Sequence, residues 1–105
     1  MTTAFADIEP RPLWKHFAEI CQIPRASTKE AAARQYVLEK ARKLGLEAVE
    51  DKAGNIVVRK PARPGRERAP MVLLQGHLDM VCQANSGTVH DFERDAIRKI
   101  GRAHV

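Results

Sequence analysis

Two residues that could bind and orient a metal ion, His77 and Asp79, follow directly after the apolar residues 71–74. If this run is a strand, side chains two positions apart project to the same side of it. An imidazole there can bind a metal through one ring nitrogen, while the neighbouring carboxylate fixes its tautomer and raises its basicity. Gly76, directly before the histidine, lets backbone or a ligand approach closely. The spacing therefore predicts half of a metal site at the end of a strand.

The pair has a plainer interpretation as well. A histidine and an aspartate at a strand end can be a polar pair whose hydrogen bonds only satisfy the following loop. In open α/β sheets, however, ligands bind outside the carboxyl ends of the strands, which is the place expected for His77 and Asp79. On the residues alone both interpretations stay open, and the position is a candidate metal site.

Other side chains that could bind metal are placed less favourably. The two cysteines, Cys21 and Cys82, are too few for a disulfide framework and lack the spacing of a metal site. They are expected to be buried or half-buried free thiols, which is typical of a reducing cytosol. His16 is expected at the polar edge of a helix and His90 in a polar loop, so neither is predicted to be a ligand.

Two helices are expected ahead of the strands. An apolar stripe in residues 13–21 predicts a helix with proline in its first turn, and Pro24 requires that it end before this point. Ser27, with Glu30 three residues on, fits a capping box and predicts the start of a second helix. Gly45 is well placed to end that helix in a left-handed conformation.

Three strands are expected after the helices. Residues 46–50 and 56–59 predict a hairpin around the turn at 51–55. Residues 71–75 are apolar on both faces, which is typical of a strand covered by helices on each side. The order of elements predicts an α/β fold in which helices pack on a mixed sheet.

The length of 105 residues permits one small domain. Residues 1–99 are interpreted as part of that domain. Residues 100–105, Ile-Gly-Arg-Ala-His-Val, match one translated frame of a common sequencing adapter, so we expect a non-native tail and do not count His104 as a ligand.

The composition favours a cytoplasmic protein. No positively charged leader with an apolar stretch is visible, and no apolar run approaches the roughly 20 residues of a membrane span. The formal net charge is +5, with a dense basic stretch at residues 59–68. A basic stretch with Pro and Gly between two strands is usually a solvated loop, so no nucleic-acid partner and no membrane partner are expected.

Residues 71–83, M-V-L-L-Q-G-H-L-D-M-V-C-Q, resemble the first metal-binding segment of the M20 family of zinc peptidases. More narrowly, the chain is similar to the aminoacyl-histidine dipeptidase branch of that family. The similarity covers about residues 10–99. Further segments agree in order and spacing, namely residues 14–17, 23–30, 51–57 and 88–95.

The resemblance implies a role for two residues of this chain. His77 matches a histidine that binds one of two zinc ions, and Asp79 matches the aspartate that hydrogen-bonds this histidine and supports the catalytic centre. The other metal ligands and the general base of the family have no counterpart here, and the carboxylates of residues 91–95 match a connecting segment. The resemblance thus implies the opening part of a zinc-dependent dipeptidase domain that hydrolyses Xaa-His and other dipeptides. Alone, this piece is expected to be inactive; the complete enzyme is expected to be cytoplasmic, with a homodimer common among relatives.

Two alternatives stay open. The chain could be a small basic non-catalytic module that binds RNA or an acidic surface through residues 59–68. It could also come from a different metallohydrolase that shares only the Gly-His-x-Asp segment at residues 76–79.

Overall fold

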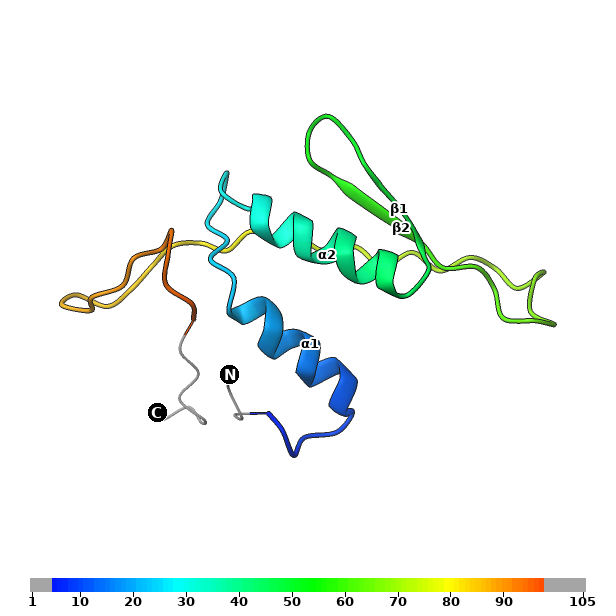
Figure 1. The fold of residues 1–105 in the computed structure, drawn as a ribbon, viewed down its shortest axis with the longest axis horizontal. Coiled ribbons are helices and arrows are strands. Elements are labelled where there is room, and N and C mark those ends of the chain that lie inside the picture. The colour runs from blue at the N-terminus through cyan, green and yellow to red at the C-terminus, as the bar shows by residue number, and fades with distance from the viewer. Residues whose placement is uncertain (1–4, 98–105) are drawn as a thin grey trace. The chain divides into compact units, whose positions relative to one another are not determined.

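The computed structural model describes residues 5–97 (Figure 1). Four elements follow one another in the chain: α1 (Arg11–Cys21), α2 (Ala31–Lys43), β1 (Glu47–Glu50) and β2 (Ile56–Arg59). They confirm the expected α/β class and the expected order of two helices and a hairpin. The expected tail at 100–105 lies outside the described residues. Neither described helix has the length and apolar character needed to cross a membrane.

The chain divides into two compact units, which are described separately. The first comprises residues 1–33 and 79–105, and the second comprises residues 34–78. The boundaries fall inside α2 and between Leu78 and Asp79.

α1 begins and ends as the sequence predicts. Proline stands in its first turn, where no backbone N–H is needed, and the helix ends at Cys21, before Pro24. Phe5 packs against two aromatic residues of α1, with ring centroids 5.1 Å from Trp14 and 5.5 Å from Phe17. The apolar stripe of α1 thus forms an aromatic cluster at its first two turns.

The start of α2 differs from the capping-box prediction. The helix begins at Ala31, and Ser27 lies in a turn outside it, in which the Lys29 N–H donates to the Ala26 carbonyl at 2.8 Å. Thr28 in this turn has a φ of +68°, a left-handed conformation that no helix continues through. The prediction was wrong because the left-handed conformation of Thr28 interrupts the backbone after Ser27, so the helix begins four residues later.

The end of α2 is as predicted. Gly45 has a φ of +72°, and its N–H donates to the Arg42 carbonyl at 3.0 Å. The Leu46 N–H donates to the Ala41 carbonyl at 2.9 Å, which completes a Schellman motif. Lys40 lies with its ammonium group 5.6 Å from the centre of the Tyr36 ring, one turn away on the same helix.

β1 and β2 form the expected antiparallel hairpin, with Glu47 opposite Arg59 and Glu50 opposite Ile56. Asp51 organises the turn: its Oδ1 accepts from the N–H groups of Ala53 and Asn55 at 2.9 and 2.8 Å. Its Oδ2 accepts from the Asn55 amide at 2.9 Å. These hydrogen bonds, that of the Asn55 side chain first, hold the pKa of the Asp51 carboxyl below its usual range.

The third expected strand is not formed. Residues 71–75 have no ladder partner among the described residues, and the four apolar side chains 71–74 are 80–92% exposed. The sheet is therefore two-stranded and antiparallel rather than mixed. The prediction of a covered strand was wrong for this chain. A covered strand needs a neighbouring strand that pairs with it and helices that cover it, and no described strand pairs with residues 71–75.

Among residues 5–97, the buried apolar residues are few and lie on the helices. They are Cys21, Ala33, Leu38 and Ala41, each at most 6% exposed. Most of these side chains are small. The buried apolar core of the described residues is therefore small, and the helices supply it.

Candidate functional site

Asp79 is held by the segment that follows α1. The Ser27 hydroxyl donates to Asp79 Oδ2 at 2.6 Å, across 52 positions of sequence. Next to it, the Met80 N–H donates to the Arg25 carbonyl at 2.9 Å, and Ala26 and Met80 form an isolated parallel bridge. All of these residues belong to the first unit. The half-buried carboxylate is thus fixed both through its own oxygen and through the backbone beside it.

Local sequence explains why this support forms. Pro24 ends α1 and leaves the next residues extended, so that their backbone can pair with another segment. The turn at Thr28 then redirects the chain into α2. Ser27 therefore stands between the extended pairing segment and the turn, with its hydroxyl available for Asp79.

His77 is exposed, and it belongs to the second unit. The boundary between the units falls between His77 and Asp79. The spacing predicts that the His77 and Asp79 side chains project to the same side of the chain, and this stays a prediction.

The residues that the structure describes do not build a complete metal centre. Within residues 5–97, no three His, Cys, Asp or Glu side chains lie close enough together to hold an ion. Catalytic zinc takes about three protein ligands and a water. The described residues therefore do not hold a metal ion by themselves, and His77 fits at most a role as one ligand among several.

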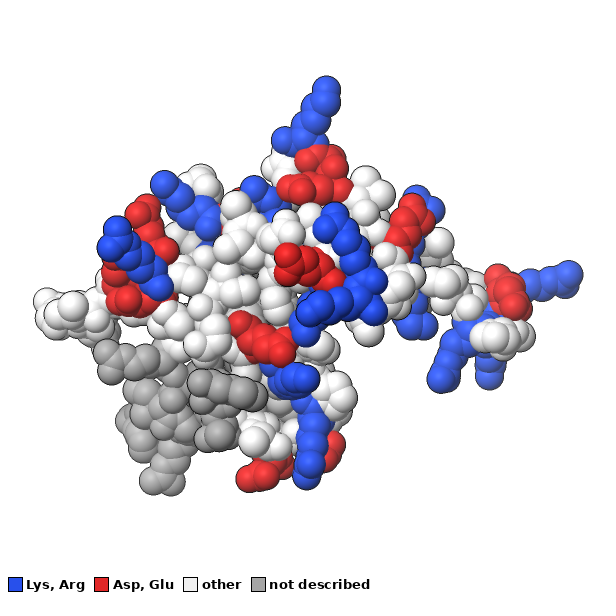
Figure 2. Space-filling view, viewed as in Figure 1, with Lys and Arg blue, Asp and Glu red and all other residues white. Residues whose placement is uncertain are grey.

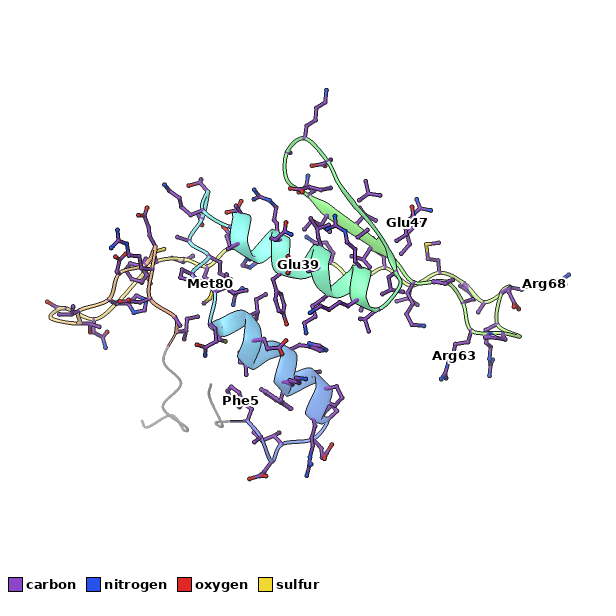
Figure 3. All side chains as sticks on the ribbon, in the orientation of Figure 1. Phe5, Glu39, Glu47, Arg63, Arg68 and Met80 are labelled. Carbon is purple, nitrogen blue, oxygen red and sulfur yellow. The ribbon has the colours of Figure 1, made fainter. Side chains whose placement is uncertain are left out.

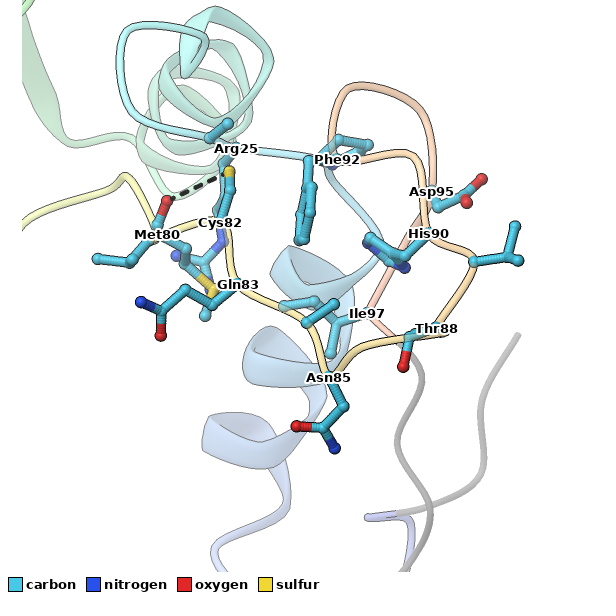
Figure 4. Close-up of a pocket in the computed structure, with 15 residues that line it drawn as sticks. Arg25, Met80, Cys82, Gln83, Asn85, Thr88, His90, Phe92, Asp95 and Ile97 are labelled. Atoms are coloured by element: carbon cyan, nitrogen blue, oxygen red, sulfur yellow. Dashed lines mark hydrogen bonds between the residues drawn. The ribbon is translucent and has the colours of Figure 1, made fainter.

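A cavity of about 1250 Å³ opens beside Met80 in the first unit (Figure 4). Its wall consists of residues 24–26 and the loop after Asp79, and Ile97 anchors the end of that loop through an N–H donated to the Cys21 carbonyl at 3.0 Å. His90 and Phe92 line it with their rings edge to face, 4.9 Å between centroids. The His90 side chain is half-buried and packs on Phe92.

The other side chains considered from sequence have structural surroundings. Asp95 Oδ2 accepts from the Asp91 N–H at 2.8 Å, which closes a turn in the loop. His16 is half-exposed on α1, with Nδ1 3.5 Å from Glu19 Oε1, as expected for the polar edge of a helix.

The two thiols differ from each other. Both Cys21 and Cys82 are free, and Cys21 is buried as expected. Cys82 is exposed, contrary to the prediction of a buried or half-buried thiol.

Charge does not concentrate at one site on the visible face. Figure 2 shows lysine and arginine side chains close to aspartate and glutamate over most of it. Every residue of the basic loop from 59 to 70 is exposed, and Figure 3 shows Arg63 and Arg68 pointing outward at its tip. This is the arrangement of a solvated loop.

Comparison with known proteins points to one class, the dipeptidases. The chain is 45% identical over 93 residues to the cytosol non-specific dipeptidase of Escherichia coli (strain K12), which is 89% of this chain and 19% of that protein. It also superimposes on the crystal structure of aminoacylhistidine dipeptidase from Vibrio alginolyticus with a TM-score of 0.85 and 42% identity, over 90% of this chain and 19% of that one. No family model matches the chain.

These likenesses confirm the resemblance to dipeptidases that the sequence indicates. The chain spans about a fifth of the length of both relatives. Membership of the M20 family and the roles of single residues stay predictions.

Proposed function

We propose that this chain is a piece of a zinc-dependent dipeptidase of the M20 family, an enzyme that hydrolyses Xaa-His and other dipeptides in the cytoplasm. The observation that carries the proposal is the combination of a TM-score of 0.85 with 42% identity to an aminoacylhistidine dipeptidase. At that identity the two chains are alike in sequence as well as in fold. This supports the inference that the whole protein has the same activity as that relative.

Within that enzyme, His77 is proposed as a ligand of one of two zinc ions. Such ions polarise the peptide carbonyl and lower the pKa of a bound water to about 7. Asp79 is proposed to hold the imidazole in the tautomer that leaves one nitrogen for the metal. The tether from Ser27 supports this role, because it restrains the carboxylate independently of any ligand.

The chain alone is proposed to be inactive. The described residues hold no group of three donors for a metal. A dinuclear site further needs carboxylates shared between ions roughly 3.5–4 Å apart, and a base to take a proton from water. Those groups have to come from other parts of the enzyme, which we expect to be a homodimer.

The test compares the whole product of the gene that carries this sequence with the 105-residue chain. After removal of metal with a chelator and addition of zinc, the whole product should cleave alanyl-histidine, as measured by chromatography of the released histidine. The 105-residue chain should not. A whole product that lacks metal-dependent cleavage of any dipeptide would overturn the proposal.

His77→Ala in the whole product separates a ligand from a structural histidine. We expect loss of cleavage with little change in the melting temperature, because the side chain is exposed in the described chain. The matched control is His16→Ala, which removes a half-exposed histidine of α1 and should keep wild-type turnover. Wild-type turnover of His77→Ala with added zinc would remove this residue from the mechanism.

A further inference from the structure

Ser27 makes a close hydrogen bond to a residue that the proposed function places at the catalytic centre. The separation of 2.6 Å between its Oγ and Asp79 Oδ2 falls in the range of hydroxyl-to-carboxylate hydrogen bonds, which are shorter and about twice as strong as neutral ones. A serine hydroxyl has one proton to donate, so this bond takes its whole donor capacity. Because α2 begins only at Ala31, Ser27 does not stand at its N-cap position, and the hydroxyl proton is donated to the carboxylate.

The backbone around this bond is built to hold it. The Met80 N–H reaches the Arg25 carbonyl at 2.9 Å, and Ala26 pairs with Met80 in a parallel bridge. These contacts join the residues directly before Ser27 to the residue directly after Asp79. The two side chains consequently meet at neighbouring positions of paired segments, rather than through a chance contact of long side chains.

We propose that Ser27 is a positioning residue for Asp79, an inference that rests on the proposed function. Its hydroxyl fixes Oδ2 and with it the plane of the carboxylate, so that the group is preorganised for the imidazole two residues before it. Without the hydroxyl the carboxylate loses this restraint on Oδ2, so the geometry it presents to the imidazole becomes less uniform. Supporting residues of this kind typically contribute 10–100-fold to metal affinity or activity.

The test uses three variants of the whole gene product. Ser27→Ala removes the hydroxyl, Ser27→Thr restores one, and Ser86→Ala makes the same chemical change as the first in an exposed turn. For Ser27→Ala we expect about a 10-fold lower kcat with KM little changed. We also expect about a 10-fold weaker affinity for zinc, measured by competition with a chromophoric chelator in the absence of substrate.

Ser27→Thr should recover most of both losses, and Ser86→Ala should match the wild type. Wild-type zinc affinity and kcat in Ser27→Ala would overturn the inference. Equal losses in the alanine and threonine variants, with a lowered melting temperature, would also overturn it, since the hydroxyl would then not be the cause. Failure of the proposed function is distinguishable, because it shows in the wild type as the absence of zinc-dependent cleavage.

Discussion

Arg34 and Glu50 connect α2 to the last residue of β1: the Arg34 Nε donates to Glu50 Oε2 at 3.0 Å. Both side chains are partly exposed, at 25% and 36%, so the pair itself contributes no more than about 1 kcal/mol to the stability of the second unit. Its importance is geometric. The arginine side chain lies under the hairpin turn, where it passes close to the backbone of Gly54.

Gly54→Ala is expected to destabilise the hairpin. Gly54 has a φ of +92°, which an L-residue rarely adopts, and an added Cβ would lie 3.4 Å from the Arg34 side chain. We expect a loss of about 1 kcal/mol in the free energy of unfolding, measured by urea denaturation. Gly65→Ala is the control: its φ is +87°, but nothing lies within 4 Å of its Cβ, and the exposed loop can relax. A smaller loss at Gly54 than at Gly65 would contradict the prediction.

Asp51 should make the hairpin sensitive to acid. Its pKa is lowered in the folded chain, so the folded state binds this proton more weakly than the unfolded state does. The stabilisation is therefore fully present above the unfolded pKa of about 3.9 and is lost as the pH falls through the lower folded value. Unfolding measured from pH 6 to pH 2 should show this loss in the wild type and not in Asp51→Asn. Asp7→Asn, a change of an exposed carboxylate outside the hairpin, should keep the wild-type profile; a parallel profile for Asp51→Asn would refute the prediction.

Leu38→Ala on α2 should cost more stability than the same change at Leu44, directly after the helix. Leu38 is 6% exposed and is the largest side chain among the buried apolar residues. Truncating a buried leucine removes apolar burial and leaves a cavity, for which we expect about 2 kcal/mol of lost stability. Leu44→Ala, at 68% exposure, should cost under about 0.5 kcal/mol. Equal melting temperatures for the two variants would show that Leu38 is not a core residue.

Residues 71–74 should cause self-association of the 105-residue chain. Their side chains are 80–92% exposed, and their backbone has no ladder partner among the described residues. Such an edge is a template for pairing with another chain. Leu73→Lys should shift the mass distribution in light scattering toward monomer. Gln75→Lys adds the same charge without removing an apolar side chain and should have less effect; equal effects would indicate that net charge alone controls association.

The sequence predicts the parts of this fold that depend on local chemistry. Pro24 ends α1 and Gly45 ends α2, because each restricts or permits backbone angles at its own position. The hairpin can likewise be predicted from its turn, where the Asp51 carboxylate accepts hydrogen bonds from backbone N–H groups no more than four residues away. These features need no information from distant residues.

The features that the sequence missed depend on distant partners. Ser27 has the spacing of a helix cap, and only its approach to Asp79 decides where its proton goes. Residues 71–75 have the composition of a covered strand, but covering depends on neighbours that composition cannot supply. For the candidate site, spacing marks His77 and Asp79 as candidates, which stays a prediction, whereas nothing in the sequence signals the contact of Ser27 with Asp79.

The bridge between Ala26 and Met80 has a consequence for the order of events in folding. The segments that it joins are separated by a long stretch of chain, and closing that stretch costs entropy before the contact returns any energy. During synthesis, moreover, Ser27 leaves the ribosome well before Asp79 is added. The hydrogen bond from Ser27 to Asp79 is thus completed late, after α2 and the hairpin can already exist, so a chain that ends directly before Asp79 should retain the helix and hairpin signals.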